Sequence, residues 1–253
     1  MARPDDVGPL RIEQCVASDH TALTMSGVLD GVTYRQARDA ILKAAVDGPA
    51  NLVMDVTAVD APSASAWSVF TSARWLTSQW PDVPMGLSCG HLAGRETLIR
   101  NGIGRYVPIF HDVAAAVAAL TLAVPAVRLR MRQQWPADAS SLPAAREFVA
   151  HWLTVWGSAD MIPTATVVAT VLVDNVLRHT GSNPDLRLEV NGANVTVAVS
   201  DHDTAQAVVH EDAEAAGRLH ELAIVGVLSL AWGNTPTDSG KTVWAVMGPQ
   251  NRL

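Results

Sequence analysis

The sequence predicts an α/β unit followed by an α+β unit. In residues 1–121, strand patterns alternate with helix patterns, which favours a mainly parallel sheet. After Pro125 the order becomes a strand, two helices and a hairpin, which favours helices on one face of an antiparallel sheet. The length of 253 residues suits either one large domain or two smaller ones, and the change of pattern at Pro125 favours two. A chain that is 49% hydrophobic and 17% charged is not disordered.

The first part carries short strand patterns, each followed by a helix pattern. Thr21–Gly27 alternates apolar and polar residues, as a half-buried strand does, and residues 51–57 read as a buried strand. Helical spacing of Ala37 and Ile41 predicts a helix over 32–48, which Gly48 and the following proline end. The remaining expectations are a helix from about 64 that stops before Pro81, strands at 83–88 and 106–110, and helices over 94–102 and 111–122.

The second part begins with clean alternation over Val127–Gln133, which predicts a strand. A helix should start near Ser140 or Ser141, and a second, largely buried helix should cover 162–180. The segment 185–201 has Asn-Gly between two alternating runs and predicts a hairpin. Residues 241–247 predict the last strand.

Charge and composition exclude several classes of function. Residues 1–121 carry 9 basic and 12 acidic side chains and the remainder 9 and 13, so neither part offers the basic excess that nucleic acid binding needs. The start of the chain lacks a secretory signal, and the apolar stretch Val113–Val127 is too interrupted to span a membrane. Cys15 and Cys89 are too few for a disulfide framework, and we expect buried thiols in a reduced cytoplasm.

Common catalytic motifs are missing from the sequence. The run Ser239–Thr242 looks like part of a phosphate-binding loop, but Thr235 stands where that loop needs glycine, and a strand rather than a helix follows. No pair of histidines has metal-ligand spacing, and His202 and His210 are expected on the surface.

Four separated segments of the second part agree with one family in order and spacing: LVDNVLRHT (172–180), VSDHD (199–203), a Gly217-Arg218 turn and GKTVWAVM (240–247). Residues 124–249 resemble the histidine-kinase-like ATPase domain of serine-kinase anti-sigma factors, an α/β sandwich. Residues 7–121, through GVLDGVTYRQARDAI (27–41) and VMDVTAVDAPSASAWSVF (53–70), resemble the STAS domain of anti-sigma factor antagonists, an α/β domain.

The ATPase resemblance implies a helix face with a glutamate that takes the serine proton and, four residues later, an asparagine that ligates Mg²⁺. Asn175 keeps the asparagine position, whereas Val171 replaces the glutamate, and Asp174 is only a remote substitute. Asp201 matches the residue that reads adenine, and Thr242 matches a threonine that contacts nucleotide.

Glycines that let the loops approach the nucleotide are largely lost. Asp203 and Ala205 stand at two glycine positions, and only Gly217 and Arg218 remain of the second glycine box. Two interpretations of Asn175 and its polar neighbours stay equally open: the residues still bind a nucleotide, or they have only a structural role. The resemblance therefore implies no firm cofactor, with ATP or ADP and Mg²⁺ bound weakly if at all.

The STAS resemblance implies a phosphoacceptor serine within an Asp-Ser-Ser-Gly run after the central strand. This run aligns with Ser63, Ala64, Ser65 and Ala66, so Ser65 keeps the acceptor position. An ordinary helix-capping serine is the alternative. Trp67, two residues later, is expected to be exposed at a protein interface.

Together the resemblances imply a partner-switching transcription regulator whose kinase module is catalytically dead. Its partners would be a sigma factor, an anti-sigma factor or an antagonist, and its two domains could occupy each other within one molecule or across a homodimer. The alternatives are an active serine protein kinase and a nucleotide-sensing scaffold.

Overall fold

The computed structural model describes residues 8–123, 128–202, 222–237 and 240–253. The chain divides into two compact units, Met1–Pro125 and Ala126–Leu253, called here the first and second units. Each unit has its own sheet and its own hydrophobic core. They are described separately.

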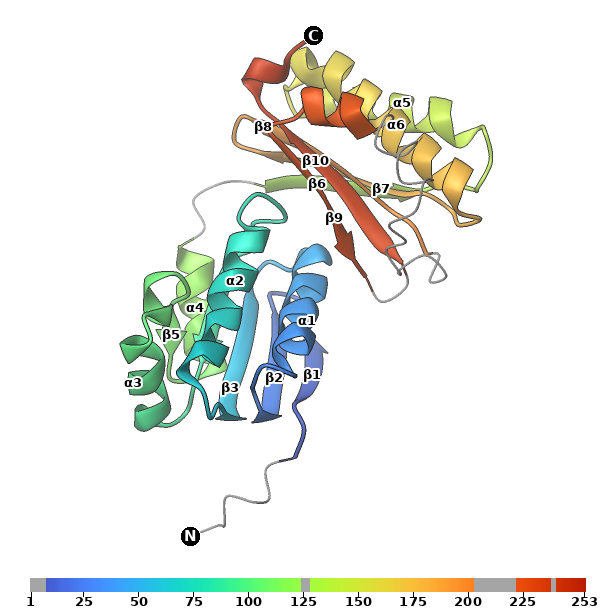
Figure 1. Ribbon diagram of the computed structural model, residues 1–253. Helices are drawn as coiled ribbons and strands as arrows, with labels where there is room; N and C mark the ends of the chain where they lie inside the picture. Colours follow the sequence, from blue (N-terminus) through green and yellow to red (C-terminus); the bar gives the residue numbers. More distant parts are fainter. Residues whose placement is uncertain (1–7, 124–127, 203–221, 238–239) are drawn as a thin grey trace. The chain divides into compact units, whose positions relative to one another are not determined.

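The first unit contains a five-stranded sheet in the order β1-β2-β3-β4-β5 (Figure 1). Strand β1 pairs antiparallel with β2, and the other neighbouring pairs are parallel, as the alternation of strands and helices predicts. The strands are β1 (Arg11–Val16), β2 (Thr21–Val28), β3 (Leu52–Asp60), β4 (Met85–Ser88) and β5 (Ile109–Phe110). The sequence pattern did not indicate β1, and Cys15 on this edge strand is exposed, so its expected burial was wrong.

Helices cover both faces of this sheet (Figure 1). The main core receives side chains from three helices, whereas α4 packs through Ala116 and Leu120 in a separate cluster with Val53 of β3. The helical elements are α1 (Tyr34–Val46), η2 (Ala64–Trp67), α2 (Ser68–Thr77), α3 (Leu92–Arg100), η3 (Ile103–Arg105) and α4 (Val113–Leu122).

The second unit contains a five-stranded antiparallel sheet in the order β6-β7-β8-β10-β9. Its strands are β6 (Arg128–Gln134), β7 (Asp185–Asn191), β8 (Asn194–Ser200), β9 (Ala231–Pro236) and β10 (Lys241–Met247). Gly192 takes φ of 59° in the tight β7–β8 turn, the left-handed conformation that Asn-Gly predicts there.

Two long helices, α5 (Ser141–Val155) and α6 (Ile162–His179), cover one face of this sheet (Figure 1). The short 3-10 helix η4 (Ala159–Met161) lies between α5 and α6 in the chain, and η6 (Pro249–Asn251) follows β10. Residues 222–227 are also helical. The core between helices and sheet is built from small and branched side chains, including Val149, Val168 and Leu186. The architecture is the α+β arrangement that the sequence predicts.

The opposite face of the second sheet carries charge. Glu189, 2% exposed, lies within ion-pair distance of Arg130 at 2.8 Å, Arg187 at 3.1 Å and Arg128 at 3.8 Å. Burial lowers the pKa of Arg187 to about 10, an effect that Glu189 opposes and the neighbouring arginines reinforce. Arg187 therefore remains charged at neutral pH.

One helical stretch, Ala159–His179, is long and apolar enough to cross a membrane by length and composition. Half of that window is buried inside the second unit, and its side chains belong to the core there. A core helix of a soluble protein passes the same test, so the stretch is weak evidence for a membrane span.

Candidate functional site

Ser65 lies in η2, directly after strand β3 of the first unit. Its side chain is exposed, and its Oγ is 2.7 Å from Oγ of Ser63. The Ser65 carbonyl oxygen accepts a hydrogen bond of 2.7 Å from the Ser68 hydroxyl. The N-cap position belongs to Ser63, which makes no side-chain capping bond, so the interpretation of Ser65 as a capping residue was wrong.

A cleft of about 470 Å³ opens beside this serine. Its lining comes from η2 and from the start of α1, which follows β2 in the chain. The lining residues are Gly31, Tyr34, Arg35, Arg38, Ser63, Ser65 and Ala66. The hydroxyl of Tyr34 also lies 2.8 Å from Oγ of Ser72, which links α1 to α2 beside the cleft.

The tryptophan expected at an exposed interface is in the core. Trp67 is 6% exposed and its ring stacks on Phe70 with centroids 6.2 Å apart. Because Trp67 ends η2 and faces the sheet, it anchors the segment that presents Ser65. Trp75 on α2 is instead 74% exposed.

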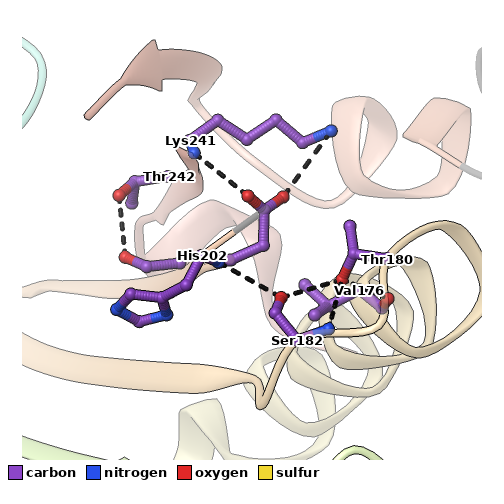
Figure 2. A network of polar contacts seen from close by, with 8 residues as sticks. Val176, Thr180, Ser182, His202, Lys241 and Thr242 are labelled. Atoms are coloured by element: carbon purple, nitrogen blue, oxygen red, sulfur yellow. Dashed lines mark hydrogen bonds and ion pairs between the residues drawn. The ribbon is translucent and has the colours of Figure 1, made fainter. Parts of the chain in front are cut away.

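The second candidate site is a polar network at the ends of β8 and β10 (Figure 2). Asp201 is 2% exposed and accepts a hydrogen bond of 3.1 Å from the backbone N–H of Lys241, while Lys241 Nζ lies 3.6 Å from its other carboxylate oxygen. A Cβ added at Gly240 would stand 2.5 Å from the Asp201 carbonyl oxygen, so only glycine fits there without a shift. Asp201 thus already has a cation and an N–H as partners.

Two further hydrogen bonds join this network to its neighbours. Oγ1 of Thr242 lies 2.7 Å from Oγ of Ser200 on the paired strand. The backbone N–H of His202 donates to Oγ of Ser182, which lies 2.9 Å from the Thr180 hydroxyl at the end of α6 (Figure 2). His202 is exposed, as expected.

Helix α6 carries the three positions that the resemblance relates to catalysis. Val171 is partly buried and packs against the core of the second unit. Asp174 forms an ion pair of 2.8 Å with Arg178 one turn later, so its carboxylate is engaged. Asn175 is buried, 5% exposed, and its side chain has no hydrogen-bond partner among the residues that the structure describes.

The remaining predicted positions, Asp203, Ala205, Gly217 and Arg218, lie outside the described residues. The described positions fit a nucleotide poorly. Asp201 is paired with Lys241, and the Thr242 hydroxyl lies 2.7 Å from Oγ of Ser200. Asn175 alone offers an unused polar group.

The sequence pattern alone does not single out the arginines of the Ser65 cleft. Arg35 and Arg38 belong to the predicted helix over 32–48, but their side chains were not assigned a role. Their spacing of three residues, which places both on one helix face, is the signal that was available.

Comparisons with known proteins bear on the first unit. No curated protein matches the chain in sequence. One similar solved structure is an anti-sigma factor antagonist from Mycobacterium paratuberculosis, 20% identical, with a TM-score of 0.40 over 47% of this chain and 98% of that chain. Another is the anti-sigma factor antagonist SpoIIAA in its unphosphorylated form, 14% identical, with a TM-score of 0.36 over 46% and 100% of the two chains. In sequence, residues 12–116 match the STAS domain family, and the first unit of this protein therefore contains a STAS domain.

Proposed function

We propose that the protein is a partner-switching regulator of transcription, of the anti-sigma factor and anti-sigma factor antagonist type. Its STAS domain binds a partner protein, and phosphorylation of Ser65 controls that binding. The observation that carries this proposal is the exposed hydroxyl of Ser65 on the segment after β3 of a STAS domain. The partner is a sigma factor, an anti-sigma factor or another antagonist.

In this proposal the second unit is a degenerate histidine-kinase-like ATPase module that acts by binding proteins. Phosphoryl transfer to a serine needs a group that takes the hydroxyl proton. Val171 has no such group, and Asp174 is paired with Arg178. The poor fit of Asp201 and Thr242 to a nucleotide also favours a binding module over an active serine kinase or a nucleotide sensor.

The proposed place of action is the cytoplasm. The acidic balance of both parts of the chain disfavours direct contact with nucleic acid, so an effect on transcription passes through a protein partner.

Substitutions at Ser65 test the proposal once a partner has been isolated from the native cell by pull-down and mass spectrometry. We expect Ser65→Ala to bind the partner as the parent does and Ser65→Asp to bind on the order of tenfold more weakly, since a charge must be desolvated at the contact. Titration calorimetry measures both affinities. Ser78→Asp, at the other end of α2, is the matched control. Equal affinity of all forms would refute control through Ser65.

A further inference from the structure

The Ser65 cleft is cationic in a chain that is acidic overall. Arg35 and Arg38 both line it, and their spacing places them one turn apart on α1. Arg35 is exposed, and its side chain has neither an ion pair nor a hydrogen bond with any residue within the described ranges. An arginine side chain that makes no ion pair with a described residue and lines a cleft with two serine hydroxyls is able to bind an added anion there.

Arg38 is engaged on one edge. Its Nε and Nη2 donate to the same oxygen of Asp39, at 2.9 and 2.7 Å. A guanidinium group has five N–H donors in a fixed fork, so further donors on Arg38 are unused by this pair. The Arg38–Asp39 bond therefore orients the side chain while leaving it able to bind a second anion.

The Asp30 carboxylate, close to the cleft in the chain, is bound by backbone N–H groups and not by the arginines of the cleft. Asp30, next to the lining residue Gly31, accepts hydrogen bonds from the backbone N–H groups of Thr33 and Val32. The Thr33 N–H above all, and the Val32 N–H, hold the pKa of Asp30 below its usual value, so this carboxylate is ionised. Asp30 and Asp39 are thus both engaged by other donors, whereas the Arg35 side chain makes no ion pair with a described residue, although Asp39 lies one turn later on the same face of α1.

We propose that this cleft is a built-in receptor for a phosphoryl group on Ser65, which Arg35 and Arg38 clamp. The proposal rests on the proposed function, because it takes Ser65 as the phosphoacceptor. A separate serine kinase supplies the group from ATP: the bond from the γ-phosphorus to ADP breaks, a bond to Ser65 Oγ forms, and the hydroxyl proton passes to a base of that kinase. Ser63, 2.7 Å from Ser65, can then donate its own hydroxyl proton to the phosphate.

Binding of the phosphate by Arg35 and Arg38 changes the surface charge that a partner protein meets around Ser65. Phosphate oxygens and guanidinium groups form short, charge-assisted hydrogen bonds, often two per arginine. Bound in this way, the phosphate adds less negative charge to the surface, and Arg35 is no longer available to an acidic partner. The phosphorylated and unmodified forms thus differ in an exposed cation as well as in the added phosphate.

The test uses the full chain with phosphoserine incorporated genetically at position 65, so that no kinase is needed. Phosphorus NMR follows the second ionisation of the phosphate, whose pKa is about 6 without a partner. We expect this pKa to be about one unit lower in the parent than in an Arg35→Gln, Arg38→Gln double variant, because cations favour the dianion. Arg100→Gln on α3, and phosphoserine placed instead at position 78, serve as matched controls that should not show the shift.

An equal pKa in the parent and in the double variant would overturn the clamp and leave the proposed function intact, since partner binding is measured separately. Inorganic phosphate, titrated into the unmodified chain, distinguishes a free anion from the attached one. Sub-millimolar binding of inorganic phosphate that the double variant abolishes would make the cleft a site for a free anion and would also overturn the proposal. We expect no such binding.

Discussion

At residue 240 the absence of a side chain decides how closely the end of β8 can approach the start of β10. A Cβ there would overlap the Asp201 backbone and carboxylate. The sequence shows Gly240 and Asp201 only as members of separate segments 39 positions apart, and nothing local predicts their contact or the Lys241 ion pair. Both depend on the pairing of β8 with β10, which brings Thr242 opposite Ser200.

Gly240→Ala should lower the free energy of unfolding of the second unit by about 1 to 3 kcal/mol, the usual cost of forcing extra volume into a packed site. Denaturant unfolding followed by tryptophan fluorescence measures the loss. Gly181→Ala is the matched control, since nothing lies within 4 Å of a Cβ at that position. A Gly240→Ala variant as stable as the Gly181→Ala variant would show that the close approach is not needed.

At the scale of whole elements, the sequence predicts interior strands and long helices better than edge strands. Strands β2, β3 and β10 have many buried positions, and the apolar residues at these positions form patterns that can be recognised in the sequence. The two missed strands, β1 and β9, lie at sheet edges, and AWGNTP of β9 contains residues that disfavour strands elsewhere. Backbone pairing with a neighbour, rather than side-chain pattern, places them.

Strand pairing also assembles a charge cluster that no single segment reveals. The alternation of Arg128, Arg130 and Arg132 predicts a strand with three arginines on one face. Only the pairing of β6 with β7 brings Glu189 opposite Arg130 and Asp185 to Arg132, whose guanidinium binds that carboxylate at 2.8 and 2.7 Å.

Removing the charge of Glu189 should be strongly destabilising, because several arginines then face one another without it. We expect Glu189→Gln to cost about 3 to 5 kcal/mol, the range for breaking a buried ion pair. Thermal and denaturant unfolding measure the change. The same substitution at Glu147, exposed on α5, should stay within about 0.5 kcal/mol. Similar stability of the two variants would contradict a structural role for Glu189.

At the scale of the whole molecule, each of the two units carries one candidate site. The first unit has the cleft beside Ser65, and the second has the polar network around Asp201. The resemblances to known families singled out Ser65 and the α6 positions as candidates. The sequence could not show that Asp174 pairs with Arg178, that Trp67 is buried, or that Arg35 and Ser65 line one cleft. These outcomes depend on side-chain packing between elements that are distant in sequence.

The full chain should not phosphorylate itself, because in the proposed function Val171 leaves the second unit without a group that takes the serine proton. Loss of positioned proton transfer lowers rates on the order of a hundredfold to ten-thousandfold. Incubation with labelled ATP and Mg²⁺ should leave the parent unlabelled, and Val171→Glu should stay unlabelled because Lys241 still occupies Asp201. Robust labelling of the parent that disappears in Ser65→Ala would instead establish an active kinase.

Helix α4 has a mechanical consequence for the first unit. It is the last described helix before the junction, and its buried side chains Ala116 and Leu120 pack with Val53 in a cluster separate from the main core. Asn51 Nδ2 fastens its last turn through a hydrogen bond of 2.9 Å to Thr121 Oγ1. Tension applied along the chain through the second unit would load this clasp first. Under such a pull, we expect α4 to detach from the sheet before the main core of the first unit unfolds.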